Sequence, residues 1–444
     1  MVKLFKTDWQ HHKSLLFLAW PMILSNISVP LLGLVDTAVI GHLDNSAFLA
    51  GVALGSMLIS IAFWLAGFLR MSTTGLIAQA YGANDVKRQM QILKQGLVIA
   101  VVLGILLILL LPMFRLLITE FFKASPDAIE YAQSYVAIRL FSAPAALMNL
   151  VLLGWMLGMQ FSKGPFYLVL VTNITNIILD IIFVVVFQWQ VEGAALASAI
   201  SDYLSLFFAL YLANHVAKQH GYSLKLSFAM PLSNVSALLR ANGNIFFRSL
   251  CLQLCFGFMT YYGGVMGDHY LAANAVLLNF LMLVSFALDG IAYAAESKVG
   301  HACGQKNVRE IHSWVWVSAC WGMIFAVIYS VFFSVFGASL IALLTDIPEV
   351  RSTATLYLPW LIVLPIFASM SFIFDGVFVG LMKTKAMRDS MAISALVGFA
   401  AVFYTFKEHG NDALWAAMSS FMLLRGITLM VVYACLYRQD RLLK

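Results

Sequence analysis

The chain has 444 residues, of which 62% are hydrophobic and only 11% are charged, and its mean hydropathy is positive. Soluble domains carry about a quarter of their residues as charged side chains, so this composition excludes a soluble globular protein. The formal net charge of +6 does not indicate nucleic-acid binding, because the basic residues are sorted between the loops. We therefore expect a membrane protein without a nucleic-acid partner.

Long apolar stretches recur along the whole chain. A helix needs about 20 apolar residues to cross a bilayer, and a helix satisfies its own backbone amides in lipid. The alternating segments typical of an outer-membrane barrel do not occur in the sequence. We predict an all-α polytopic membrane protein with twelve transmembrane helices at 15–40, 49–80, 95–114, 131–159, 165–188, 192–217, 243–266, 271–302, 314–344, 354–382, 390–407 and 411–437.

The distribution of basic residues predicts the orientation. With the N-terminus inside, only Arg115, Lys123, Arg351 and Lys407 of the 27 Lys and Arg residues fall in outer loops. Cytoplasmic loops carry the excess of Lys and Arg, so both termini are predicted to be cytoplasmic. Residues 1–14 are polar and lead directly into a full-length span, so we expect no cleavable signal peptide. The expected location is the plasma membrane, in a bacterium the inner membrane.

The two halves of the chain repeat each other at an offset of 222 residues. Six spans per repeat is an even number, so both repeats insert the same way round and are parallel, an architecture typical of transporters. We predict an N-lobe at 1–217, a cytoplasmic linker at 218–242 and a C-lobe at 243–444 around a central cleft. The matches pair Ala80, Gly82, Val86 and Lys87 with Ala302, Gly304, Val308 and Arg309, and Gly154 and Gly158 with Gly376 and Gly380.

Two acids, Asp36 and Asp180, lie deep inside apolar stretches of the first half, and the second half has neither at the matching position. An acid inside a membrane is costly unless it faces the bundle interior or a wet cavity, so it is a functional-site hypothesis. Both spans run from inside to outside, which places the two acids at similar depth. Two neighbouring carboxylates in a low-dielectric pocket can share a proton near neutral pH.

Polar residues accompany Asp180. Asn176 lies four residues earlier on the same helix face, and Thr172 and Asn173 extend this polar strip. Ser198, early in the next span, returns to similar depth. The alternative reading is that these are hydrogen-bonded packing residues, but two acids at matched depth favour a site for a proton or cation.

Pro21 lies within the first span and removes a backbone hydrogen bond. It predicts either a static kink or a hinge whose bend depends on the protonation of Asp36.

The second half has its own buried charges. Asp289 and Glu296 are seven residues apart on one helix face, and Asp375 precedes the repeated glycine pair. Arg248 lies near the inner end of the seventh span. These residues are candidates either for a structural ion pair, such as Arg248 with Glu296, or for a role toward ion or substrate.

No motif for nucleotide hydrolysis, metal-dependent or serine hydrolysis, or paired-Cys metal binding occurs in the sequence. We therefore expect no enzyme activity and no cofactor, and energy either from an ion gradient, of protons with sodium as an alternative, or from the substrate's own gradient. Abundant aromatic and Met side chains are suited to adaptable binding of hydrophobic small molecules.

The chain resembles the multidrug and toxic compound extrusion (MATE) family. The resemblance is carried by two six-span halves and by Pro21, Asp36, Asn176, Asp180 and Ser198 at these spacings. The segments Ala287–Glu296, with Gly300 and Gly304 after it, and Phe374–Gly376 resemble the DinF (DNA-damage-inducible) branch.

The resemblance implies cation-driven antiport of hydrophobic, often cationic, compounds out of the cell, by a protein expected to be a monomer in the bilayer. It implies a proton site at Asp36, Asn176 and Asp180, where sodium is also possible, and bending of the first helix at Pro21. The NorM branch binds sodium at an acid pair in the C-lobe. This chain keeps Asp375 but has no acid in its seventh span, which favours proton coupling.

Three other functions are alternatives to drug export. A flippase of lipid-linked oligosaccharide shares the broad architecture but would need several basic residues in its cavity, and only Arg248, Lys298 and Arg70 could serve. An intramembrane enzyme could use Asp36 and Asp180 as an aspartyl dyad, but the flanking motifs are missing. A channel has less use for a duplicated two-lobe design.

Overall fold

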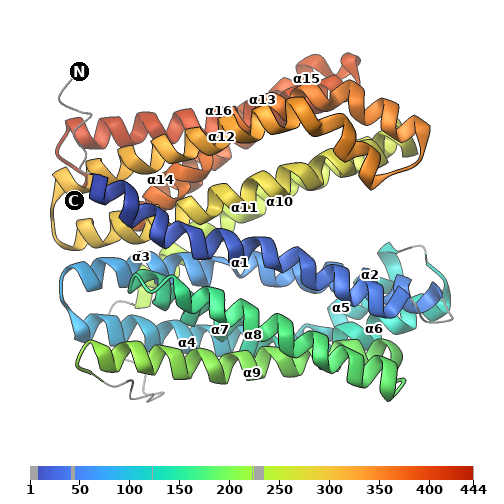
Figure 1. The fold of residues 1–444 in the computed structure, drawn as a ribbon, viewed down its shortest axis with the longest axis horizontal. Helices are drawn as coiled ribbons and strands as arrows, with labels where there is room; N and C mark the ends of the chain where they lie inside the picture. The colour runs from blue at the N-terminus through green and yellow to red at the C-terminus, as the bar shows by residue number, and fades with distance from the viewer. Residues whose placement is uncertain (1–8, 42–45, 123, 223, 225–234, 444) are drawn as a thin grey trace. The chain divides into compact units, whose positions relative to one another are not determined.

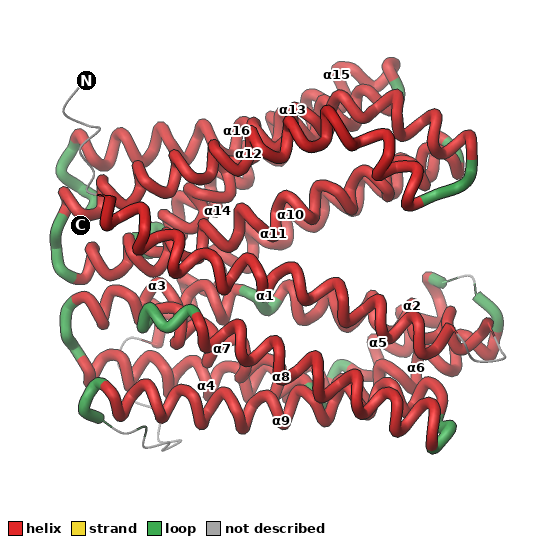
Figure 2. The backbone as a smooth tube through the Cα atoms, viewed as in Figure 1, coloured by secondary structure: helices red, strands yellow, loops and turns green. Residues whose placement is uncertain are grey.

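The computed structural model describes residues 9–41, 46–122, 124–222, 224 and 235–443, except for the side chains of residues 29–41, 46 and 235–237. Throughout these residues the regular structure is helical and no strand occurs (Figure 2). This agrees with the predicted all-α class. Uninterrupted helix is expected for apolar segments that must satisfy their backbone hydrogen bonds internally.

The chain divides into two compact units. The N unit comprises residues 24–237, and the C unit comprises residues up to Ile23 together with those from Leu238 onward. The long first helix, α1 (Trp9–Gly41), therefore contributes residues to both units, and the division falls two residues after Pro21. The helix is continuous through Pro21 (Figure 1).

After α1, the described residues of the N unit form eight α-helices and one π-helix. Its core is built around side chains such as Trp155, Leu69 and Leu93, which are fully buried. The elements are α2 (Ser46–Leu65), α3 (Phe68–Gly82), α4 (Val86–Leu109), α5 (Leu111–Phe121), α6 (Pro126–Phe141), α7 (Ala143–Gly158), α8 (Lys163–Asp180), the π-helix η2 (Ile181–Val186) and α9 (Gln190–Gln219).

The C unit follows the same order with longer, less interrupted helices. Trp415, Phe421 and Phe333 are fully buried in its core. Its elements are α10 (Val235–Met266), α11 (Asp268–Gly304), α12 (Val308–Leu344), α13 (Pro348–Gly380), α14 (Thr384–Ile393), the π-helix η3 (Ser394–Ala401), α15 (Val402–Phe406), the 3₁₀ turn η4 (Lys407–His409) and α16 (Asn411–Arg438).

Among the described residues, nine helices are long and apolar enough to cross a membrane, or ten if the bent pair α6 and α7 counts as one span. The chain is therefore a multi-pass membrane protein. The two remaining predicted spans, 15–40 and 243–266, fall on α1 and α10, and each of these helices includes side chains outside the described set. The count of twelve and the two-lobe layout stay predictions.

The predicted single helix at 131–159 is instead a pair of helices, α6 and α7, which bend by 51° at Ser142. Pro144, in the first turn of α7, explains the break, because proline cannot donate the hydrogen bond that would continue α6. Gly104 of α4 approaches the backbone of Pro144 so closely that a side chain there would collide with it.

The predicted repeat recurs in local structure. A Cβ on Gly154 would lie 2.5 Å from the carbonyl oxygen of Arg70, and one on Gly376 would collide with the carbonyl oxygen of Ala292. Gly376 and Ala292 each lie 222 residues after their counterparts Gly154 and Arg70. Asp85 caps α4 through the amide of Arg88, and Asn307 caps α12 through that of Glu310, again at this offset. Each GxxxG pair thus brings a neighbouring backbone into direct contact.

Candidate functional site

A polar face on α8 forms the candidate coupling site of the N unit. Thr172, Asn176 and Asp180 are spaced by four residues, so they lie in a row along one side of the helix. Asn176 and Asp180 are almost completely buried, each 1% exposed. An acid in such surroundings is costly to ionise, which is the property that a proton-binding carboxylate needs.

Helix α9 supplies the partners of this polar face. Nδ2 of Asn176 donates to the hydroxyl of Ser198 at 3.0 Å, and the hydroxyls of Thr172 and Ser205 lie 2.8 Å apart. The later residue of α8, Asn176, pairs with the earlier residue of α9, Ser198, so the two helices are antiparallel. Ser198, expected from the sequence at similar depth to the acids, is the partner of Asn176, whereas Ser205 was not among the predicted residues.

A hydrogen bond joins the described part of α1 to α8. Nδ2 of Asn173 donates to the main-chain carbonyl of Ser28 at 3.1 Å. Asp36 lies eight residues beyond Ser28 and Asp180 seven residues beyond Asn173, which corresponds to ~12 Å and ~10 Å along the two helices. The two helices run in the same direction in Figure 1, so both acids are carried toward the same end of the N unit. The side chain of Asp36 lies outside the described residues.

The helix changes its winding directly after Asp180. Residues Ile181–Val186 form the π-helix η2, and π-helical turns are frequent at functional sites. Gly193 of α9 packs against this segment, because a Cβ there would lie 3.1 Å from the backbone of Phe183. The wider turn and the close approach of α9 are therefore features of the backbone immediately beside the buried acid.

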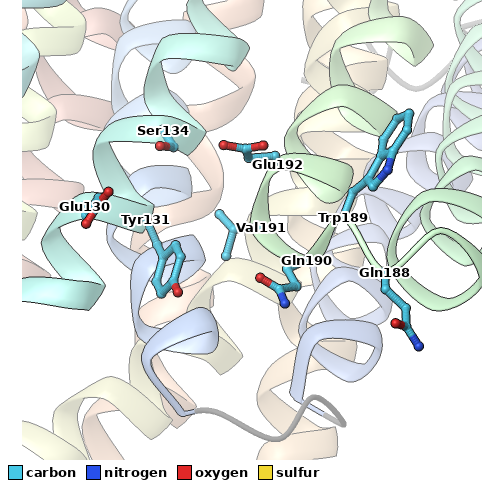
Figure 3. Close-up of a pocket in the computed structure, with 8 residues that line it drawn as sticks. All are labelled: Glu130, Tyr131, Ser134, Gln188, Trp189, Gln190, Val191 and Glu192. Carbon is cyan, nitrogen blue, oxygen red and sulfur yellow. The ribbon is translucent and has the colours of Figure 1, made fainter.

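A small polar cavity of about 300 Å³ lies where η2 is followed by α9 (Figure 3). Its wall combines Glu130 and Ser134 of α6 with Gln188 and Glu192, and the side chains of Ser134 and Glu192 point toward one another (Figure 3). Gln188 and Gln190 have φ of +57° and +51°, a left-handed conformation that is uncommon outside glycine. This cavity was not predicted from the sequence.

A partly buried ion pair lies at the bend between α6 and α7. Nη1 of Arg139 lies 2.6 Å from Oδ2 of Asp202 on α9, and the same carboxylate oxygen accepts a hydrogen bond from Ser142 at 2.8 Å. The main-chain carbonyl of Asp202 also accepts from Asn149. Asp202 was not among the predicted residues, and its pairing is the kind that stabilises a charge within a bundle.

The C unit holds a buried triad of charges. Oδ2 of Asp375 accepts hydrogen bonds from Nη1 of Arg248 at 2.9 Å and from Nη2 of Arg425 at 2.6 Å. The three residues come from α13, α10 and α16, and each side chain is at most 11% exposed. The sequence had suggested Glu296 as an example of a partner for Arg248, but the ion pair found is with Asp375. Arg425 was not foreseen.

The remaining predicted residues belong to the C unit. Glu296 is buried on α11 at 1% exposure, and a Cβ on Gly380 would collide with its main-chain oxygen. Asp289 is half-buried on the same helix. Pro21 is half-buried within α1, in the part that belongs to the C unit.

Comparison with known proteins agrees with the fold and with the sequence resemblance. The MatE family model matches residues 21–182 and 245–403, one segment in each half. DNA damage-inducible protein F of Escherichia coli (strain K12) is 43% identical over 422 residues, which cover 95% of this chain and 92% of the relative. Human multidrug and toxin extrusion protein 1 is 26% identical over 72% of this chain and 56% of its own.

Among solved structures, a crystal structure of a MATE protein in the bent conformation aligns with a TM-score of 0.88 and 20% sequence identity. The alignment covers 99% of this chain and 98% of that one, which shows that the two share a fold. The family match covers most of the chain, and the relative from Escherichia coli is similar over nearly its whole length. The chain therefore belongs to the MatE family of multidrug and toxic compound extrusion transporters, in its DinF-type branch.

Proposed function

We propose that this transporter is a proton-coupled antiporter that exports hydrophobic or cationic compounds by alternating access. The observation that carries the proposal is the almost complete burial of Asp180 beside the hydrogen bond between Asn176 and Ser198. The position of Asp36 along α1 supports a second carboxylate at similar depth. Asn and Ser side chains can hydrogen-bond to either the neutral or the ionised form of a carboxyl group, so the cluster suits a group that changes its protonation.

The charges of the C unit argue against a second cation site there. Asp375 already accepts from the guanidinium groups of Arg248 and Arg425. A sodium ion at this carboxylate would be repelled by two fixed positive charges within a few ångströms. Coupling through the N unit is therefore favoured, and the proton is favoured over sodium as the coupling ion.

Protonation is proposed to act on α1. When Asp36 and Asp180 take up protons, their charges are lost and the contacts of α1 with α8 change. Asn173, which holds the carbonyl of Ser28, links the two helices. Pro21 supplies a point of bending, because the carbonyl four residues before a proline lacks its helical hydrogen bond. The bent conformation of the solved MATE protein with the same fold supports such a movement.

The energetics permit uphill export. One charge crossing a potential of ~100 mV contributes about 2.3 kcal/mol, and one pH unit adds about 1.4 kcal/mol per proton. Two protons would therefore sustain a gradient of more than about a hundredfold in a drug, since each tenfold step costs about 1.4 kcal/mol.

The finer features of the proposal follow the sequence predictions. They are twelve spans in two lobes, cytoplasmic termini, location in a bacterial inner membrane, action as a monomer, and no cofactor. The alternative is a MATE-related flippase of a lipid-linked oligosaccharide, which would need free cationic groups. Arg248 and Arg425 are bonded to Asp375 instead.

The proposal is tested by ethidium or norfloxacin efflux from pump-deficient bacteria that express wild type, Asp36→Asn or Asp180→Asn, with and without a protonophore and with and without sodium. Efflux that is abolished by the protonophore and by either substitution supports proton antiport. Efflux that persists in both variants would mean that these acids are structural and would direct attention to Asp289, Glu296 and Asp375. A wild type that moves no drug would favour the flippase.

A further inference from the structure

A long apolar groove lies on the C unit between α12, α13 and α16. It has a volume of about 780 Å³. Exposed side chains such as Ile324 and Ile328 continue along the same face of α12. In a membrane-spanning unit, such a surface meets lipid chains. The groove is lined mainly by flexible or branched apolar side chains, among them Met323, Ile324, Val327, Met370 and Met430.

One end of the groove is polar. His312 and Tyr433 line it there, with 3.3 Å between Nδ1 of His312 and the hydroxyl of Tyr433. The ring of Tyr437 stacks on His312 with the centroids 4.8 Å apart. These residues lie in the first turns of α12 and the last turns of α16. The groove thus has an apolar body and a single end with hydrogen-bonding groups.

Basic residues adjoin this polar end along the two helices. Arg309 lies one turn before His312 on α12, and Arg438 follows Tyr437 at the end of α16; both are exposed. Both belong to segments that the distribution of Lys and Arg assigns to the cytoplasmic side. Basic pockets between transmembrane helices on that side bind the headgroups of anionic lipids.

We propose that this groove is a binding site for an anionic phospholipid of the inner leaflet. One acyl chain lies in the apolar body along α12, and the phosphate is held near Arg309 and Arg438. His312 and Tyr433 are within reach of the glycerol and ester oxygens. Met side chains adapt their shape readily, which suits a chain of variable length and unsaturation.

The charge of the groove distinguishes a lipid from an exported drug. The residues that line it include no carboxylate, and the two arginines at its polar end would repel a cationic compound. Each basic residue near the headgroup is expected to strengthen binding of an anionic lipid about fivefold. The binding preference is therefore expected to depend on headgroup charge and to be insensitive to transported cations.

The test uses the fluorescence of Trp316, which lines the groove and is 36% exposed. The full-length protein is reconstituted into phosphatidylcholine vesicles that contain a minor fraction of either phosphatidylglycerol or phosphatidylcholine with brominated acyl chains. The signal of Trp316 is taken as the difference between wild type and Trp316→Phe. We expect brominated phosphatidylglycerol to quench this difference signal at several-fold lower mole fraction than brominated phosphatidylcholine.

Charge variants complete the test. Arg309→Gln combined with Arg438→Gln is expected to remove the preference for phosphatidylglycerol. The matched control is Lys87→Gln combined with Arg88→Gln, which removes the same charge at exposed positions of the N unit. Lys87 is the repeat counterpart of Arg309. The control variant is expected to keep the preference for phosphatidylglycerol. Equal quenching by both lipids in wild type would overturn the proposal. So would relief of the quenching by ethidium, which would identify the groove as a substrate site.

Discussion

Nδ2 of Asn173 donates a hydrogen bond to the main-chain carbonyl of Ser28, with 3.1 Å between the two atoms. This contact joins α1 to α8 within the N unit, two turns before Asp36 on one helix and nearly two turns before Asp180 on the other. A movement of α1 relative to α8 must strain or break it. The contact is therefore placed to connect the protonation of the acids with the position of α1.

Substitution of Asn173 tests this connection. Asn173→Ala removes the donor and leaves the Ser28 carbonyl without it, a loss expected to cost about 1 kcal/mol, or roughly a fivefold change in the balance of two α1 positions. We expect slower efflux at unchanged expression. Ile174→Ala, at the adjacent and half-exposed position, is the matched control and is expected to transport normally. Equal rates for the two variants would show that the contact is only structural.

Asp180→Asn keeps the shape of the side chain and removes its ability to release a proton. Because Asp180 is 1% exposed, no water can replace the missing function, and we expect loss of drug efflux with normal thermal stability. Asp127→Asn, at an exposed position in the first turn of α6, should leave efflux intact. The measurement is ethidium efflux at matched membrane abundance.

The close contacts of the repeated glycines predict a structural effect. Gly154→Ala and Gly376→Ala would each place a methyl group against a main-chain carbonyl, of Arg70 and Ala292 respectively. Overpacking of this kind destabilises by about 1–3 kcal/mol, so both variants should unfold at lower temperature in detergent. Gly257→Ala, where a Cβ meets nothing within 4 Å, should be neutral or slightly stabilising because alanine favours helix.

The triad of the C unit predicts asymmetric effects of charge removal. Asp375→Asn leaves two buried arginines without their shared carboxylate, and breaking a buried pair costs about 3–5 kcal/mol. We expect a large fall in the thermal midpoint. A second substitution, Arg425→Gln, should restore part of the stability. Asp346→Asn removes the partner of Arg351 at a fully exposed carboxylate and should change the midpoint little; a similar fall in both variants would contradict the buried triad.

Tyr222, which follows α9 and lies outside the membrane-spanning helices, makes a contact with a pH signature. The hydroxyl of Tyr222 donates to Oε1 of Gln89 at 2.7 Å, and burial, assisted by the nearby Tyr81, raises the pKa of Tyr222 to about 12. The folded state thus favours the neutral phenol. Its contribution to the folding stability is complete below the pKa of about 10 in the unfolded chain and is lost as the pH rises toward 12. Wild type should therefore lose more stability than Tyr222→Phe over this alkaline range.

The helical class and the positions of the helices could be predicted, because apolar runs of this length can form few structures other than a helix in a membrane. The break at Ser142 was missed, although Pro144 was a signal for it. The face shared by Asn176 and Asp180 followed from their spacing of four residues. Ser205 and Asp202 were missed because periodicity identifies the polar face of one helix but does not show which residues of another helix meet it.

The charged pairs show the same limit. Arg248 and Asp375 were both identified as buried charges, yet their pairing depends on how α10, α13 and α16 pack. Arg425, which was not singled out from the sequence, is a second partner of Asp375. The proposed function of the predicted site residues stays a prediction.

The most direct test of proton coupling is transport by purified protein in vesicles with an acidic lumen and a more alkaline exterior. Ethidium is suitable because it is a permanent cation that a pH difference alone does not trap. We predict that added ethidium enters wild-type vesicles and that a trapped pH indicator records simultaneous loss of lumenal protons, whereas Asp180→Asn vesicles show neither and a sodium gradient alone drives no uptake. Ethidium uptake without proton movement, or normal exchange in Asp180→Asn, would contradict the account.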